Sequence, residues 1–114
     1  MIRNVVVGVV HPGVTTVKVE EALQALRDLR VDGLELRLVA GQDRGLRSGN
    51  ASYALTVDFA TDEDYRRYDR DPEHNRIRDE LFAPISASIQ RIQFALPDGG
   101  AAERGSTRWP PALA

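Results

Sequence analysis

The sequence predicts an α+β domain whose elements follow the ferredoxin-like order βαββαβ, with the strands in one antiparallel sheet. Two observations carry this prediction. Segments with the two-residue period of strands alternate in that order with segments that have the 3.6-residue period of helices. The second helical region carries two start signals, at Thr61 and at Pro72, so we expect it in two pieces. In this split βαβ plan the helices cover one face of the sheet.

The first half of the chain supplies two strands and one helix. Residues 2–10 are β-branched and apolar at both odd and even positions, which is typical of a strand covered on both faces. Thr15 or Thr16 is the expected N-cap of a helix that runs to about Leu29. The apolar stripe of this helix consists of Val19, Ala22, Leu23 and Leu26. A strand with alternating leucines follows over residues 34–39.

The second half repeats the pattern after a loop over residues 40–51. We expect a strand at 52–59, then a short helix that Thr61 caps and that ends near Asp69. Pro72 restarts the helix, which is expected to run to about Ser86 with a bend at Pro84. The last strand is expected at 88–96. Residues 42–51 of the loop are expected to flank the mouth of a pocket, where Arg44 and Arg47 would gate an anionic or carboxylate-bearing ligand; the alternative is a solvated loop.

The first strand predicts a partner for the sheet. If Asn4, Val6 and Gly8 face the helices, then Val5, Val7 and Val9 lie on the other face, which nothing in the chain covers. An apolar face of this size calls for a partner, and a second copy of the sheet would bury it. We therefore expect a homodimer through the open sheet face.

Composition limits the classes of protein that the chain can be. Its 114 residues suggest one domain, at residues 1–96, followed by a flexible C-terminal tail at 97–114. The tail contains Trp109, the only tryptophan, which is either disordered or docked on the body or on a partner. A net charge of −2 argues against nucleic-acid binding. The longest apolar segments are too short for a membrane span, so we expect a cytoplasmic protein.

No pattern in the sequence points to a metal or cofactor. There is no cysteine, no phosphate-binding loop and no Rossmann glycine fingerprint, and the two histidines are too few for most metal sites. We therefore expect neither a metal nor a cofactor.

A set of polar side chains is expected to converge on one cavity between sheet and helices. Asn4 and Tyr53 face the helices by strand parity, Tyr68 ends the first helical piece, and His74 lies in the first turn of the second. His74 continues into the apolar stripe of Ile77, Leu81 and Ile85. Neutral imidazole beside a tyrosine hydroxyl can move a proton. The alternative is a buried structural histidine among core aromatics.

These residues carry a resemblance to a known family. Residues 1–6, Pro12-Gly13, residues 53–59, Tyr68 and the run Asp71-Pro72-Glu73-His74 resemble the stress-responsive dimeric α/β barrel (Dabb) family over residues 1–96. The resemblance implies a homodimer with a small-molecule pocket between sheet and helices. In the olivetolic acid cyclase-like members, His74 would correspond to the catalytic histidine and Tyr68 to its partner. Asn4 and Tyr53 stand at positions where these relatives carry histidine.

Two functions are consistent with the sequence. The first is a cofactor-independent cyclase or lyase that acts on a hydrophobic, polyketide-like or aromatic small molecule. Here His74 and Tyr68 are catalytic, and Asn4, Tyr53, Ile77 and Leu81 bind substrate. The second is a non-catalytic small-molecule-binding stress-response protein. Cofactor-free monooxygenases of the same dimeric barrel fold are a further alternative that the resemblance leaves open.

Overall fold

The computed structural model describes residues 1–97 and contains the predicted elements in the predicted order. The strands are β1 (Ile2–Val10), β2 (Arg37–Gln42), β3 (Tyr53–Phe59) and β4 (Ser86–Ala95). The helices are α1 (Thr16–Asp28), α2 (Asp62–Asp69) and α3 (Pro72–Ile77), followed by the π-helical turn η1 (Arg78–Phe82). All strand pairs are antiparallel in the order β2-β3-β1-β4. The ferredoxin-like α+β prediction is therefore confirmed. The flexible tail predicted at 97–114, which contains Trp109, lies almost wholly outside the described residues.

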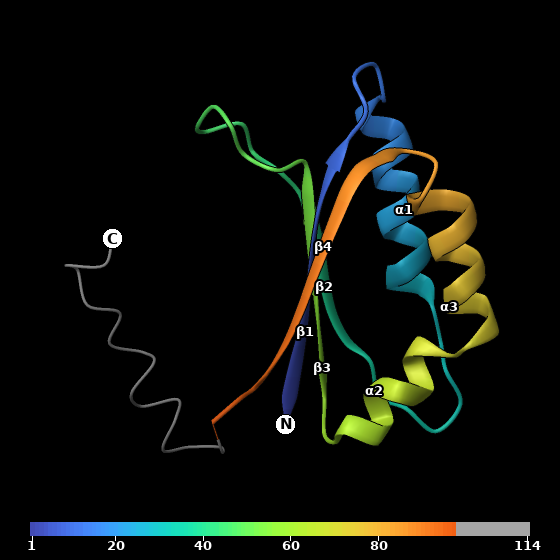
Figure 1. Cartoon of the computed structure of the whole chain (residues 1–114). Coiled ribbons are helices and arrows are strands. Elements are labelled where there is room, and N and C mark those ends of the chain that lie inside the picture. The colour runs from blue at the N-terminus through green and yellow to red at the C-terminus, as the bar shows by residue number, and fades with distance from the viewer. Residues whose placement is uncertain (98–114) are drawn as a thin grey trace.

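The helices cover one face of the sheet, which is seen nearly edge-on in Figure 1. Alternate residues of β3 point toward them, and Tyr53, Leu55, Val57 and Phe59 are all buried. They pack against the predicted stripe of α1, whose four members Val19, Ala22, Leu23 and Leu26 are also buried. Thr15 caps this helix by accepting a hydrogen bond from the Lys18 amide at 3.2 Å. Local signals and packing thus agree for this layer.

Strand β2 differs from its predicted position by three residues at each end. It pairs with β3 from Arg37 opposite Asp58 to Gln42 opposite Tyr53. Residues 34–36 lie beyond the end of β3, so they have no strand to pair with; Leu34 closes a turn by donating to the Val31 carbonyl at 3.0 Å, and residues 35 and 36 are irregular. At the other end, pairing with β3 extends the strand through Ala40 and Gly41, which local composition assigned to the loop.

The second half of the split helix ends earlier than predicted. Regular α-helix stops at Ile77, and η1 follows, in which the Ala83 amide donates to the Arg78 carbonyl at 2.9 Å. Pro84 lacks the amide that would continue the ladder and its ring would crowd the carbonyl four residues earlier. The proline therefore terminates the helix instead of bending it. Strand β4 begins at Ser86, paired with Val10 across a bulge, which is earlier than expected.

The opposite face of the sheet is open and apolar. In the register of β1, Val5, Val7 and Val9 share this face with Ile92 and Phe94 of β4. Val7 is 37% exposed, Ile92 60% and Phe94 45%. At one end of the strip, Arg3 donates two hydrogen bonds to its cross-strand neighbour Asp58, at 2.8 and 2.9 Å. The predicted parity of β1 is confirmed, and no part of residues 1–97 covers the strip.

Candidate functional site

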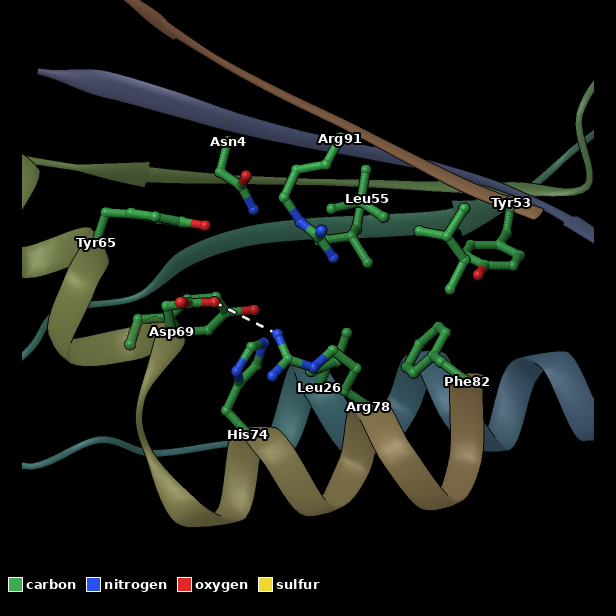
Figure 2. Close-up of a pocket in the computed structure, with 13 residues that line it drawn as sticks. Asn4, Leu26, Tyr53, Leu55, Tyr65, Asp69, His74, Arg78, Phe82 and Arg91 are labelled. Carbon is green, nitrogen blue, oxygen red and sulfur yellow. Dashed lines mark hydrogen bonds and ion pairs between the residues drawn. The ribbon is translucent and has the colours of Figure 1, made fainter. Parts of the chain in front are cut away.

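A cavity lies between the helix-facing side of the sheet and the split helix (Figure 2). Its volume is about 40 Å³, room for a few water molecules. The sheet and α1 contribute Asn4, Val6, Leu26, Tyr53, Leu55, Ile89 and Arg91. The split helix contributes Tyr65, Tyr68, Asp69, His74, Arg78 and Phe82. Four of the predicted site residues, Asn4, Tyr53, Tyr68 and His74, therefore meet at one cavity.

The start of α3 fixes the position of His74. Asp71 is the N-cap, its side chain accepts a hydrogen bond from the His74 amide at 2.9 Å, and Pro72 occupies the first turn. The imidazole is turned inward and the residue is 8% exposed. Its Nδ1 is buried and has no hydrogen-bond partner among the described residues. A buried polar atom without a partner costs about 1–3 kcal/mol, so this site carries an unused hydrogen-bonding group.

The surroundings of His74 favour the neutral imidazole. Burial lowers its pKa below the ordinary value of 6.5, and the nearby Arg78 guanidinium lowers that pKa further. The backbone of Asp69 and the carboxylates of Asp69 and Asp71 act in the opposite direction and do not prevail. At neutral pH the side chain is therefore a proton acceptor, the form that a general base requires.

Tyr68 lies directly against this imidazole. The two rings are tilted by 41° with centroids 4.1 Å apart, and Tyr68 itself is 2% exposed. Burial raises the pKa of Tyr68 well above its usual value, so the phenol stays protonated. The contact between Tyr68 and His74 is a ring contact, and no hydrogen bond joins them among the described residues. Tyr68 can therefore orient the imidazole and donate a hydrogen bond.

The side chains of Asn4 and Tyr53 already form hydrogen bonds with other side chains of the protein. The Asn4 Oδ1 accepts a hydrogen bond from Gln93 at 2.7 Å, which leaves its amide nitrogen turned toward the cavity (Figure 2). The Tyr53 hydroxyl is 2.7 Å from the Ser86 hydroxyl. Its ring also covers Gly8 so closely that a Cβ there would lie 2.1 Å from the ring. Asn4 thus offers a donor to a ligand, whereas Tyr53 mainly shapes the wall.

Ile77 and Leu81 are not among the residues that line this cavity. Ile77 is buried in the core, and Leu81 is partly buried against it. The π turn displaces Leu81 from the regular helical spacing on which the stripe was counted. Ile77 still belongs to the regular helix, and its side chain is buried in the core instead of lining the cavity. The cavity face of the split helix instead carries His74, Arg78 and Phe82.

Two arginines of the site are absent from the sequence prediction. Arg78 is four residues after His74 on the same helix, and Arg91 lies opposite Val6 on the helix-facing side of β4. Arg78 could have been found from the sequence, because it is a charged residue on the otherwise apolar face that begins at His74. Arg91 could not have been found in this way, because its position in the site depends on the register of β4, which local composition does not provide.

The hairpin loop between β2 and β3 does not flank this cavity, contrary to the expectation for Arg44 and Arg47. No residue of the loop lines it. The loop leans away from the helices, toward the open side of the sheet (Figure 1). Asp43 holds its two sides together by accepting hydrogen bonds from Gly45 and Asn50, each at 2.9 Å. The pairing of β2 through Gln42 directs the loop past the end of the sheet.

Residues 1–97 contain neither a metal-binding cluster nor a membrane-spanning helix. No group of three or more His, Asp or Glu side chains there could hold a metal ion. No helix in that part of the chain is both long and apolar enough to cross a membrane.

Residues 2–95 match the model of the Stress responsive A/B Barrel Domain, Dabb. The chain belongs to the Dabb family. A dimeric ferredoxin-like protein of unknown function from Thermobifida fusca is 30% identical to this Dabb chain, with a TM-score of 0.75. That match covers 83% of this chain and 90% of the other. The resemblance drawn from Tyr68 and the Asp71-Pro72-Glu73-His74 run is thus confirmed at the level of the family.

More distant structures share the Dabb fold. A hydroxynitrile lyase from Passiflora edulis is 15% identical, with a TM-score of 0.71 and coverage of 87% of this chain and 95% of that one. A dimeric ferredoxin-like protein of unknown function from Jannaschia is 20% identical, with a TM-score of 0.63 and coverage of 82% and 97%. No curated protein matches the chain. At these identities the likeness concerns the fold alone.

Proposed function

We propose that this Dabb protein is a cofactor-independent lyase or cyclase that acts on a hydrophobic small molecule, with His74 as general base. The observation that carries the proposal is the His74 imidazole, which is neutral, buried and unpartnered at Nδ1 in the wall of a cavity. A perturbed histidine in a cavity is a candidate for acid–base chemistry on stated physical grounds. The name of the Passiflora relative supports a lyase.

The proposed chemistry makes or breaks a carbon–carbon bond next to a carbonyl group. In the lyase direction, His74 takes the proton of a substrate hydroxyl, a carbonyl forms, and the adjacent carbon–carbon bond breaks. The electron pair leaves with the departing carbon, which then takes the proton from the imidazolium. In the cyclase direction, His74 removes a proton from carbon and the carbanion attacks a carbonyl, as in an aldol reaction. The alkoxide that forms then takes the proton from the imidazolium. Either route moves one proton and needs no net oxidation.

Tyr68 and Asn4 have supporting parts in this proposal. The Tyr68 ring fixes the plane of the imidazole, and its protonated hydroxyl can donate to a developing oxyanion. The amide nitrogen of Asn4 faces the same space. Tyr53 forms part of the wall, held by Ser86.

The assay uses mandelonitrile for the lyase and linear polyketide thioesters for the cyclase. We expect the parent chain to convert one of these probes faster than buffer alone. His74→Ala should lower turnover by on the order of 10²–10⁴. His11→Ala is the matched control, because His11 is exposed in the turn after β1, and it should retain the parent rate.

A non-catalytic binding protein is the second candidate, and the small size of the cavity favours it. A volume of about 40 Å³ admits only part of a polyketide unless side chains at the mouth move. If His74→Ala abolishes ligand binding while the parent converts no probe, this second function replaces the first.

The proposed assembly is a homodimer through the open sheet face. The support is the exposed strip of Val7, Val9, Ile92 and Phe94, together with the dimeric relatives from Thermobifida fusca and Jannaschia. Burying this strip removes apolar area from water and leaves the cavity, on the other face of the sheet, accessible.

A further inference from the structure

Arg91 is the most unusual charge in the cavity wall. Its side chain extends from β4 across the helix-facing side of the sheet into the cavity (Figure 2). It has neither an ion pair nor a hydrogen bond to another side chain within residues 1–97. By contrast, Arg3 on the open face donates two hydrogen bonds to Asp58, at 2.8 and 2.9 Å. Arg91 is an exposed residue that also lines the cavity, so its guanidinium donors are available to a ligand there.

Arg78 faces Arg91 from the opposite wall (Figure 2). Its ion pairs are long, 3.4 Å to Asp69 and 4.0 Å to Asp79. Its one short contact, 2.6 Å, is to the neutral side-chain oxygen of Asn75. The cavity wall thus holds two guanidinium groups and only one carboxylate, Asp69, while His74 adds no charge at neutral pH.

We propose that this cavity binds a carboxylate group between the guanidinium groups of Arg91 and Arg78. Two like charges that line one cavity repel each other, and an anion between them reduces that repulsion. A guanidinium matches a carboxylate in shape and can donate two parallel hydrogen bonds to it. The apolar part of the wall, which includes Leu26, Leu55 and Phe82, disfavours a more strongly hydrated dianion.

This inference rests on the proposed function and narrows its substrate to a hydrophobic carboxylic acid. Arg78 and His74 are one helical turn apart, so a carboxylate held by the arginines lies beside the imidazole. The reacting atom would then be a carbon or a hydroxyl close to the carboxylate. Charge that develops there as an enolate or alkoxide would be stabilised by the same guanidinium pair.

The test measures binding of propionate, which is small enough for the cavity, and uses its uncharged amide, propionamide, as the matched ligand. The two histidine imidazoles are followed by nuclear magnetic resonance at constant ionic strength. We expect propionate to shift the His74 signals saturably and to leave His11 unchanged, while propionamide has no effect. Arg91→Gln should weaken propionate binding about tenfold or more, as expected for the loss of a charge-assisted hydrogen bond.

Matched variants separate charge from shape. Arg44→Gln removes an arginine from the distant hairpin loop and should leave propionate binding unchanged. Arg91→Lys retains the positive charge but lacks the planar guanidinium that donates two parallel hydrogen bonds, so it should bind propionate with intermediate affinity. Equal binding of propionate and propionamide, or parent-like affinity in Arg91→Gln, would overturn the proposal. So would an equally large shift of His74 with inorganic phosphate or chloride.

The outcome separates this inference from the proposed function. Arg91-dependent binding of propionate without any effect of His74→Ala on turnover would support the carboxylate site and reject the base. A loss of turnover in His74→Ala together with no selective binding of propionate would retain the base and reject the carboxylate site.

Discussion

The rings of Tyr68 and His74 stack with centroids 4.1 Å apart, although the two residues belong to different helices. The break between α2 and α3 makes this contact: Tyr68 is near the end of one helix, and His74 lies in the first turn of the next. An unbroken helix would separate residues six apart by well over a turn. The split helix therefore brings the base and its orienting residue together.

The first prediction concerns the stability of His74 variants. Because Nδ1 has no partner, His74→Ala removes no hydrogen bond of that atom, and we expect a folded protein that melts within a few degrees of the parent. A loss of about 1 kcal/mol would shift a domain of this size by roughly 4–8 °C. Thermal unfolding followed by circular dichroism measures it. Destabilisation of several kcal/mol without a change in ligand binding would instead identify a packing residue.

The second prediction concerns the dependence of stability on pH. The folded-state pKa of His74 lies below 6.5, so between these two values the unfolded chain binds more protons than the folded one. The free energy of unfolding should therefore be highest above about pH 6.5 and fall as pH decreases toward the folded pKa. In His74→Gln this part of the slope should disappear. Urea titrations of both proteins between pH 5 and 7 check it, and parallel curves would reject the account.

The Asp58 carboxylate does not contribute to the change in stability between pH 5 and 7. The pKa of Asp58 is lowered by its hydrogen bonds to Arg3, so its contribution is retained until the solution is far more acidic.

The third prediction concerns Gly8. A Cβ at this position would lie 2.1 Å from the Tyr53 ring, so Gly8→Ala must displace that ring and its contact with Ser86. We expect destabilisation of about 1–3 kcal/mol in urea unfolding. Gly41→Ala is the matched control, because nothing lies within 4 Å of its Cβ. In a Tyr53→Leu background the cost of Gly8→Ala should fall, and an unchanged cost would show that the ring is not its cause.

The fourth prediction concerns the open face. Val7→Asp should abolish the dimer, because a charge buried without a partner costs several kcal/mol. Val7→Thr preserves the branched shape and should dimerise more weakly than the parent but remain folded. Light scattering at micromolar concentration gives the mass. Val17→Asp is the control on the exposed surface of α1 and should leave the mass unchanged. If the parent protein is a monomer under these conditions, the proposed homodimer is wrong.

Local signals were enough for most of the fold. The caps at Thr15 and Thr61, the helix start at Pro72 and the parity of β1 depend on neighbouring residues alone, and the structure has each as expected. The bounds of β2 depend on non-local pairing with β3, and the early end of the second helix depends on Pro84. Residue periodicity therefore misplaced both.

The site was predictable only in part, for the same reason. Asn4, Tyr53, Tyr68 and His74 could be placed by parity and helix starts, and all four reach the cavity. Arg91 could not, because its direction follows from the register of β4 against β1. Its charge, however, changes the chemistry that the cavity can perform.

The central claim is that the cavity holds His74 as a neutral base beside Arg78. A pH titration of the histidine imidazoles by nuclear magnetic resonance tests it most directly. We predict a midpoint for His74 below 6.5 in the parent, and a higher midpoint in Arg78→Gln, because the nearby positive charge is gone. A His74 midpoint at or above 6.5 that Arg78→Gln does not move would contradict the claim.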